Sequence, residues 1–263
     1  MTSGKNLRLL TIAVVILLAA SAAAALFALA PRNQNPESKV IRVACIGDSI
    51  TQGSAYPYDL WEMLGSRAPF TIGNYTLYPI TNNFAPSGNA RYAVGNFGVG
   101  GTMVTLKSET PYMNTSTFQQ ALKYQPNIVV IMLGTNDAQP GVHQYNASFA
   151  DDYKTLINAF QTLPTKPKIW IVLPPPIFNS QNNKTSPEYL QQNVIPHIEQ
   201  AANETNLPII DVNSVLIDYS KDFPDGIHPN VAGAKIIANE IYKAITSQNA
   251  SNIEPSYLYP ILP

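Results

Sequence analysis

The residues Gly47, Asp48 and Ser49 combine an acid and a hydroxyl directly after an apolar run, VIRVACI at residues 40–46. Glycine, aspartate and serine are common turn residues, so this stretch alone is consistent with a simple turn. Ser49 nevertheless stands where the carboxyl end of a strand is expected, and catalytic groups of open α/β sheets gather at such ends. Ser49 is therefore a candidate nucleophile, which needs a base to accept its proton.

Three other segments place polar residues at expected strand ends or just before a helix: GVGGT at 98–102, GTND at 134–137 and DGIHPN at 225–230. The carboxyl ends of parallel strands lie at one edge of a sheet, so these segments are expected to meet Ser49 in one crevice. His228 is the natural base, because an imidazole takes up and releases protons near neutral pH. Asp225 can accept a hydrogen bond from the other ring nitrogen and so fix the tautomer.

Acyl transfer also needs donors for the negative oxygen that develops during attack. The backbone N–H of Gly101 suits this role because no side chain hinders a substrate there, and the Asn136 carboxamide and the Ser49 amide are further donors. Each segment also has a plainer explanation: a glycine turn, an asparagine in a left-handed turn, or a helix that starts at His228 with Pro229 in its first turn. Turns alone do not explain four such segments at four expected element ends, so we interpret them jointly as an active site.

The four segments together resemble the sequence blocks of the SGNH (GDSL-type) hydrolases, which match here as GDSIT, NFGVGG, GTND and DGIHPN, in the right order. The resemblance covers about residues 40–245. It implies a serine nucleophile, a triad completed by an acid and a histidine, and two oxyanion donors besides the nucleophile's own amide: Ser49, Asp225, His228, Gly101 and Asn136.

Within the second block, Gly101 is preferred to Gly98 as the donor because its spacing from Asn96 fits the family pattern, and Gly100 is the adjacent alternative. The resemblance also implies the fold of the family, a three-layer α/β/α sandwich with a parallel, flavodoxin-like sheet.

The pattern of the chain independently predicts an α/β fold, because apolar runs of strand length alternate with amphipathic stretches of helix length. The expected strands lie within residues 40–46, 93–99, 127–133, 168–173 and 207–212, and the expected helices within 58–64, 117–124, 149–163, 187–205 and 231–245. Residues 70–92 are long, aromatic and rich in turn residues, which is typical of an insertion or extended loop, and they lengthen the segment before the second block.

The domain organisation is predicted from the ends of the chain. Leu9 to Ala30 carries no charge, and a helix of that length reaches about 33 Å, enough to cross a bilayer. Residues 1–30 are therefore expected to be a signal-anchor or a signal peptide, with residues 31–39 as a linker. Residues 40–247 form the expected hydrolase domain and 248–263 an extended C-terminal tail. Lys5 and Arg8 precede the apolar run, so we expect the domain to lie outside the cytoplasm.

Export is also consistent with the glycosylation sequons, which begin at Asn74, Asn114, Asn146, Asn183, Asn203 and Asn249.

Several function classes are disfavoured by composition and by missing motifs. A net charge of −1 with 13% charged residues gives no basic footprint for nucleic acid. The single cysteine, Cys45, excludes an intrachain disulfide. Thr51 stands where a standard α/β-hydrolase has the second glycine of G-x-S-x-G. The chain has no Walker A or H-E-x-x-H sequence, and His143 and His197 are expected to be surface or helix residues, so we expect no cofactor and no metal.

The substrate is less defined by the sequence than the reaction type. The loop after the fourth expected strand, IVLPPPIFN at 171–179, carries Ile177 and Phe178 as candidate substrate-binding residues. This loop and the last block are similar to those of carbohydrate acetylesterases of the family, which implies an acetylated carbohydrate or another small ester as substrate. Two alternatives stay open: a lipid acyl-ester hydrolase or thioesterase of the same fold, and a domain that binds glycan or lipid without catalysis.

Overall fold

The computed structural model of the protein describes residues 40–65, 70–72, 75–77, 91–178 and 185–250. The expected leader, the expected linker and most of the expected C-terminal tail lie outside these residues. None of the described helices is both long and apolar enough to cross a membrane.

The centre of the domain is a seven-stranded sheet in the order β3-β2-β4-β1-β5-β6-β7. The strands are β1 Val40–Gly47, β2 Phe70–Ile72, β3 Tyr75–Leu77, β4 Arg91–Gly98, β5 Ile128–Met132, β6 Lys168–Val172 and β7 Ile209–Ile210. All neighbouring pairs are parallel except β2 and β3. The five predicted strands are all present, and their order, β4-β1-β5-β6-β7, is the flavodoxin-like order 2-1-3-4-5. The predicted fold class is confirmed.

Two short strands occupy part of the segment that was expected to be an insertion or loop. β2 pairs with β4 in parallel and β3 pairs with β2 in antiparallel fashion, so they extend one edge of the sheet. FTI and YTL are rich in β-branched and aromatic residues, which favour strands. The dipeptide Gly73-Asn74 between them is a hairpin signal, so the sequence contains the information that the loop interpretation passed over.

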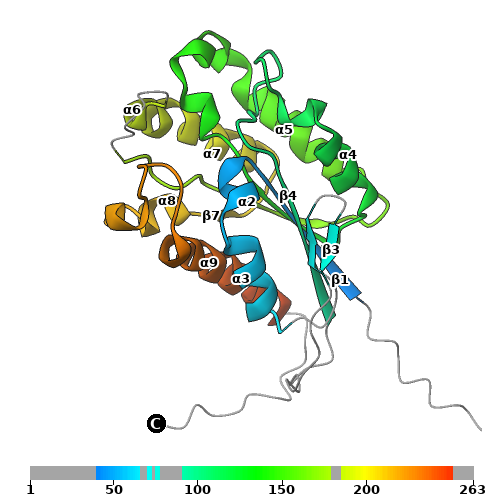
Figure 1. Ribbon diagram of the computed structural model, residues 1–263. Coiled ribbons are helices and arrows are strands. Elements are labelled where there is room, and N and C mark those ends of the chain that lie inside the picture. The colour runs from blue at the N-terminus through cyan, green and yellow to red at the C-terminus, as the bar shows by residue number, and fades with distance from the viewer. Residues whose placement is uncertain (1–39, 66–69, 73–74, 78–90, 179–184, 251–263) are drawn as a thin grey trace, which may run out of the picture. The chain divides into compact units, whose positions relative to one another are not determined.

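Helices cover both faces of the sheet (Figure 1), with α4, α5 and α7 on one side and α3 and α9 on the other. The helices are α2 Ser49–Gly53, α3 Tyr56–Met63, α4 Ser116–Lys123, α5 Phe149–Gln161, α6 Pro187–Tyr189, α7 Ile195–Glu204, α8 Val212–Val215 and α9 Val231–Ala250. Short 3₁₀ turns lie at Tyr112–Asn114, Asn136–Ala138, Pro140–Ser148 and Ser220–Asp222, and a π-helical turn lies at Leu190–Val194.

The two layers of core follow from the alternation of side chains along the central strand. Ala44 and Ile46 of β1 are buried with residues of α4, α5 and α7. Val43 and Cys45 point the other way and are buried with residues of α3 and α9. Both faces of β1 are thus apolar, as expected for a strand in the middle of a covered parallel sheet.

Two helices differ from the sequence prediction in detail. The expected helix over 187–205 contains the π-helical turn at Leu190–Val194 between α6 and α7. Pro196 follows this turn and has no N–H to donate to the carbonyl four residues earlier, which explains why the regular hydrogen-bond pattern breaks here. The last helix, α9, continues to Ala250, so the first three residues of the expected tail are helical.

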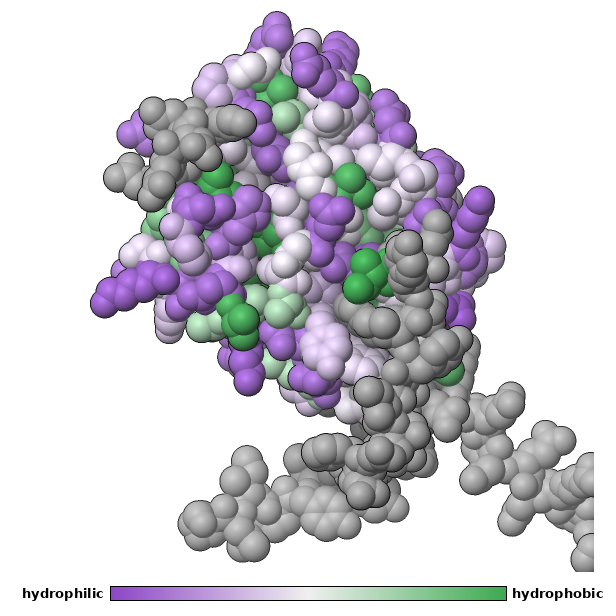
Figure 2. Space-filling view, viewed as in Figure 1, coloured by the Kyte–Doolittle hydropathy of each residue, from purple (hydrophilic) through white to green (hydrophobic). Residues whose placement is uncertain are grey.

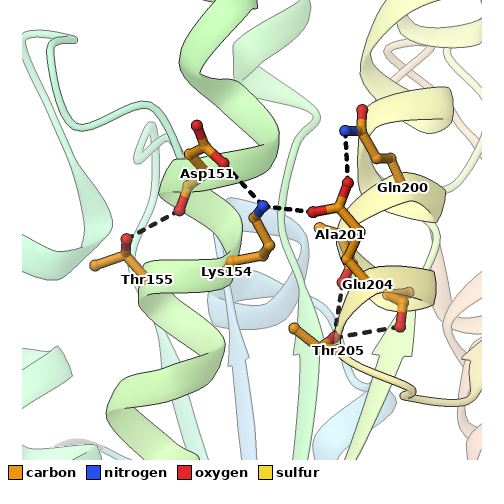
Figure 3. Close-up of polar contacts among 8 residues, drawn as sticks. Asp151, Lys154, Thr155, Gln200, Ala201, Glu204 and Thr205 are labelled. Atoms are coloured by element: carbon orange, nitrogen blue, oxygen red, sulfur yellow. Dashed lines mark hydrogen bonds and ion pairs between the residues drawn. The ribbon is translucent and has the colours of Figure 1, made fainter.

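Helices α5 and α7 are joined at the surface by a small polar network (Figure 3). Lys154 of α5 forms an ion pair with Asp151 on its own helix, at 2.8 Å, and a second ion pair with Glu204 at the end of α7. Gln200 donates to the other oxygen of Glu204 at 2.8 Å. The two carboxylates raise the pKa of Lys154. These side chains are partly or largely exposed, so the ion pairs contribute little to the stability of the fold.

Candidate active site

Ser49 lies directly after the central strand, at the start of the short helix α2. Asp48 caps this helix: its Oδ1 accepts the N–H of Ile50 at 2.9 Å. Gly47 is required here because a Cβ would lie 1.9 Å from Thr51 Oγ1 and 2.8 Å from the Met132 carbonyl oxygen. The close packing of strand end, helix and neighbouring strand therefore fixes where the Ser49 side chain emerges.

The structure brings Ser49 and His228 together across 179 positions of sequence. Ser49 Oγ lies 2.8 Å from His228 Nε2, and His228 Nδ1 lies 2.6 Å from Asp225 Oδ2. The other oxygen of Asp225 accepts the backbone N–H groups of Ile227 at 2.9 Å and of His228 at 2.7 Å. The three side chains form one continuous chain of hydrogen bonds at the carboxyl edge of the sheet.

Asp225 is held in its charged form. Burial pushes the pKa of this carboxyl upward, but the hydrogen bonds from the His228 side chain and from the backbone of His228 and Ile227 outweigh it and lower the pKa to about 2. A carboxylate at this position keeps a proton on Nδ1 of the imidazole and leaves Nε2 free to accept the proton of a hydroxyl.

Gly101 and Asn136 lie on the two loops that follow β4 and β5. Gly101 has a φ of +76°, a conformation that favours glycine. Its N–H has no partner among the described residues, whereas the N–H of Gly100 donates to Gln52 Oε1 at 2.8 Å. Asn136 Nδ2 donates to the Thr102 carbonyl at 3.0 Å, which uses one of its two N–H groups. Considering the described residues alone, Gly101 and Asn136 each retain one N–H for a further acceptor.

These two loops are joined by Asp137, a buried acid for which the sequence analysis gave no role. Its Oδ2 accepts the N–H of Val104 at 3.0 Å, and its Oδ1 accepts both the N–H and the hydroxyl of Thr105, at 3.0 and 2.7 Å. Burial raises the pKa of Asp137, and these hydrogen bonds oppose the rise. We call this set of contacts, together with that between Asn136 and Thr102, the loop clamp.

Asn96 and Gly98 connect β4 to the helix that carries Ser49. Asn96 Nδ2 donates to the Thr51 carbonyl at 2.8 Å, and its Oδ1 accepts the N–H of Gly98 at 3.0 Å. A Cβ on Gly98 would lie 2.2 Å from Gln52 N, so this glycine serves the packing of β4 against α2. In the sequence, the signal for the buried contact between Asn96 and Thr51 is a polar residue, Asn96, inside the otherwise apolar run at 93–99.

Asp48 is fully buried beneath the candidate nucleophile. Loss of water raises its pKa to about 7, although the hydrogen bond from Ile50 opposes the rise; nearby Asp137 adds to it. Asp48 Oδ2 has no hydrogen-bond partner among the described residues.

Ile177 and Phe178 lie in the loop after β6 and are not among the residues that line the cavity beside Ser49. The N–H of Phe178 donates to the Gly226 carbonyl at 2.7 Å, and its ring lies 5.1 Å from that of Phe223. Ile177 is only 6% exposed and packs into the core. Both residues line a separate cavity of about 390 Å³. This loop therefore supports the segment that carries Asp225, and substrate binding by Ile177 and Phe178 stays a prediction.

The other two histidines lie outside the site. His143 stacks on Tyr189, and His197 Nδ1 contacts the Asn193 carbonyl at 2.6 Å. Within the described part of the chain, no three His, Cys, Asp or Glu side chains lie close enough together to hold a metal ion.

The fold and this geometry define the class of the chain. A hydroxyl, an imidazole and a carboxylate linked by hydrogen bonds at the carboxyl edge of a parallel sheet form the arrangement that serine hydrolases use. The chain belongs to the GDSL-like lipase/acylhydrolase family, whose sequence pattern matches residues 45–236. The family places the chain among the carboxylic ester hydrolases.

Individual relatives agree with this class. The chain is 32% identical over 236 residues to an acetylxylan esterase of Xylanibacter ruminicola. The aligned region covers 80% of this chain and 44% of that protein. It is 25% identical over 211 residues to a multidomain esterase of Ruminococcus flavefaciens. Here the aligned region covers 73% of this chain and 27% of that protein. The chain thus spans less than half of the length of these two curated relatives.

Solved structures share the fold at low sequence identity. A lipase/acylhydrolase from Enterococcus faecalis is 19% identical with a TM-score of 0.58, over 79% of this chain and 96% of that chain.

Proposed function

We propose that the chain is a serine esterase that hydrolyses O-acyl esters of carbohydrate, in particular O-acetyl esters. The observation that carries this proposal is the hydrogen-bond chain from Ser49 through His228 to Asp225, with distances of 2.8 and 2.6 Å. These distances lie within the range needed for direct proton transfer from a nucleophile to its base.

In the proposed mechanism, Ser49 Oγ attacks the ester carbonyl carbon while its proton passes to His228 Nε2. Asp225 stabilises the imidazolium that forms, through the contact to Nδ1. The oxyanion accepts hydrogen bonds from the N–H groups of Gly101, Asn136 and Ser49. His228 then gives the proton to the leaving alcohol, and water releases acetate from the acyl-serine with the same imidazole as base.

The carbohydrate substrate is supported by the relative from Xylanibacter ruminicola, which is described as an acetylxylan esterase. The cavity beside Ser49 and His228 adds a physical argument, because Gln52 and Ser54 give its wall polar side chains. A lipid acyl chain needs a long apolar groove, which this cavity does not provide. We therefore favour the acetyl-carbohydrate substrate over a lipid acyl ester or thioester.

The test is hydrolysis of p-nitrophenyl acetate and of acetylated xylan by the purified protein, with the Ser49→Ala variant as control. Nitrophenol and acetate release far above the variant is the expected result. Equal release by the two proteins contradicts the esterase proposal and leaves a non-catalytic binding domain. A further series of acetyl, butyryl and octanoyl p-nitrophenyl esters is expected to show rates that fall with chain length; a preference for octanoyl would favour the lipid substrate.

We further propose that residues 1–30 carry the domain out of the cytoplasm, as an anchor or as a cleaved leader. The support is the uncharged run from Leu9 to Ala30 preceded by Lys5 and Arg8.

A further inference from the structure

The cavity between helix α2 and His228 has a lining that suits one half of an ester. Its volume is about 260 Å³, and its lining residues are Ser49, Gln52, Gly53, Ser54, His228 and Pro229. Clefts for drug-sized ligands typically measure about 300–1,000 Å³, so this cavity fits a small group better than a polymer segment. We infer that it is the subsite for the alcohol half of the ester and that it takes a single sugar ring. This inference rests on the proposed function.

The position of the oxyanion donors decides which half of the ester enters the cavity. Gly101 and Asn136 do not line the cavity, whereas His228 does. His228 must protonate the oxygen of the leaving alcohol, so the alcohol leaves on the imidazole side of the reacting carbon. The cavity on that side therefore receives the alcohol, while the carbonyl oxygen faces the loops that follow β4 and β5.

Gln52 gives the cavity a donor in a fixed orientation. Its Oε1 accepts the N–H of Gly100 at 2.8 Å, so the amide nitrogen points elsewhere and both of its N–H groups lack an acceptor among the described residues. The Ser54 hydroxyl contributes a second donor, since its oxygen makes only a long contact, 3.5 Å, with the N–H of Tyr56. Hydroxyl groups of a sugar are suitable acceptors for both.

The face of the domain drawn in Figure 2 is largely polar. Figure 2 shows hydrophilic side chains over most of the described surface in this view, with hydrophobic residues in small separate patches. On this face of the described domain, the hydrophobic patches are separate and do not form a continuous apolar strip.

Gly53 is one of the lining residues of the cavity and gives the sharpest test. A Cβ on Gly53 would meet no atom within 4 Å, so a larger side chain is accommodated without a clash and adds bulk at the wall of the cavity. Gly141 is a matched control: a Cβ there also meets nothing within 4 Å, and this residue lies outside the cavity.

The experiment compares kcat/KM for a monoacetylated methyl xylopyranoside with kcat/KM for vinyl acetate, whose leaving group has only two carbons. Both are followed by acid release in a pH-stat. We expect Gly53→Gln to lower the selectivity for the sugar ester over vinyl acetate at least tenfold, and Gly53→Ala to lower it by a smaller factor. Gly141→Gln is expected to leave the selectivity within twofold of wild type.

The outcomes separate this inference from the proposed function. Selectivity that stays within twofold of wild type in a folded Gly53→Gln protein overturns the sugar subsite, while the esterase proposal stands if vinyl acetate is still hydrolysed. If Gly53→Gln does not fold, unchanged selectivity of Gly53→Ala overturns it instead. Activity of wild type on vinyl acetate no greater than that of Ser49→Ala overturns the proposed function itself.

Discussion

Asp225 holds His228 by side chain and backbone at once. One carboxylate oxygen contacts the imidazole, and the other accepts two backbone N–H groups of the same loop. The side chains of Asp225 and His228 are 55% and 46% exposed, so solvent weakens their electrostatic interaction. Orientation of the ring by several hydrogen bonds therefore matters more here than the strength of a single ion pair.

Asn136 is expected to act at the residue scale as an oxyanion donor. Asn136→Ala removes the free N–H of the carboxamide and should lower kcat about 10²–10³-fold with little change in KM. Steady-state kinetics on p-nitrophenyl acetate measure this, with Asn203→Ala, an exposed residue of α7, as the control. A loss of twofold or less would return Asn136 to the role of a turn residue.

Asp48 is expected to make stability depend on pH. The ordinary pKa is 3.8 and the folded-state pKa is about 7, so between about pH 4 and pH 7 the folded protein keeps a proton that the unfolded chain has lost. Stability therefore falls as pH rises through this window, by at most about 4 kcal/mol.

The Asp48→Asn variant tests this because it has no proton to lose and retains an oxygen for the N–H of Ile50. Its Tm should exceed that of wild type by about 5 °C or more at pH 8, and the difference should shrink toward pH 4. Thermal unfolding followed by circular dichroism measures this, with the exposed Asp218→Asn as control. A difference in Tm that is the same at both pH values would rule out the proposed protonation of Asp48 in the folded protein.

At the scale of elements, the loop clamp sets the distance between the two loops that carry Gly101 and Asn136. Asp137→Asn replaces an acceptor oxygen by an N–H₂ group and leaves a buried N–H of Val104 or Thr105 unpaired, which costs about 1–3 kcal/mol. We expect the Asp137→Asn protein to have a lower Tm than wild type, a kcat at least tenfold lower and a KM within about threefold of wild type.

The split between kcat and KM distinguishes positioning of the donors from mere loss of stability. Kinetics at a temperature well below the lower Tm measure it, with Asp152→Asn as a comparison, since Asp152 Oδ2 also accepts a loop N–H, that of Leu106, at 3.0 Å. A kcat equal to wild type in folded Asp137→Asn would show that the clamp is structural only.

The helices and strands could largely be predicted from the sequence, but the contacts between them could not. Apolar runs of strand length gave the five central strands, because burial on both faces requires them. The hairpin at β2 and β3 was missed, because its short strands stand in a segment rich in turn residues. The role of Asp137 was missed for a different reason: its partners, Val104 and Thr105, become neighbours only when β1, β4 and β5 are placed side by side.

The candidate site was predictable in its residues and not in its surroundings. Ser49, Asp225 and His228 were chosen by residue type and by expected position at strand ends, and the structure places them within hydrogen-bond distance of one another. The contact between Gln52 and Gly100 depends on the packing of α2 against β4, which no local pattern encodes.

At the scale of the whole molecule, the leader is expected to decide where the domain works. The full chain, produced in a bacterial host with a secretion pathway, should be found in the membrane fraction or, after cleavage, in the medium, whereas a chain that starts at Val40 should stay in the cytoplasm. Fractionation, immunoblotting and intact mass measure this. An uncleaved full chain in the cytoplasmic fraction would contradict the expected export.

The most direct test of the central claim is covalent labelling of the nucleophile. A fluorophosphonate reacts with a serine whose proton is taken by a neighbouring base, so mass spectrometry of the labelled and digested protein should locate a single adduct on Ser49. The adduct should be absent from Ser49→Ala and strongly reduced in His228→Ala. Labelling of a different serine, or esterase activity that survives in Ser49→Ala, would contradict the account.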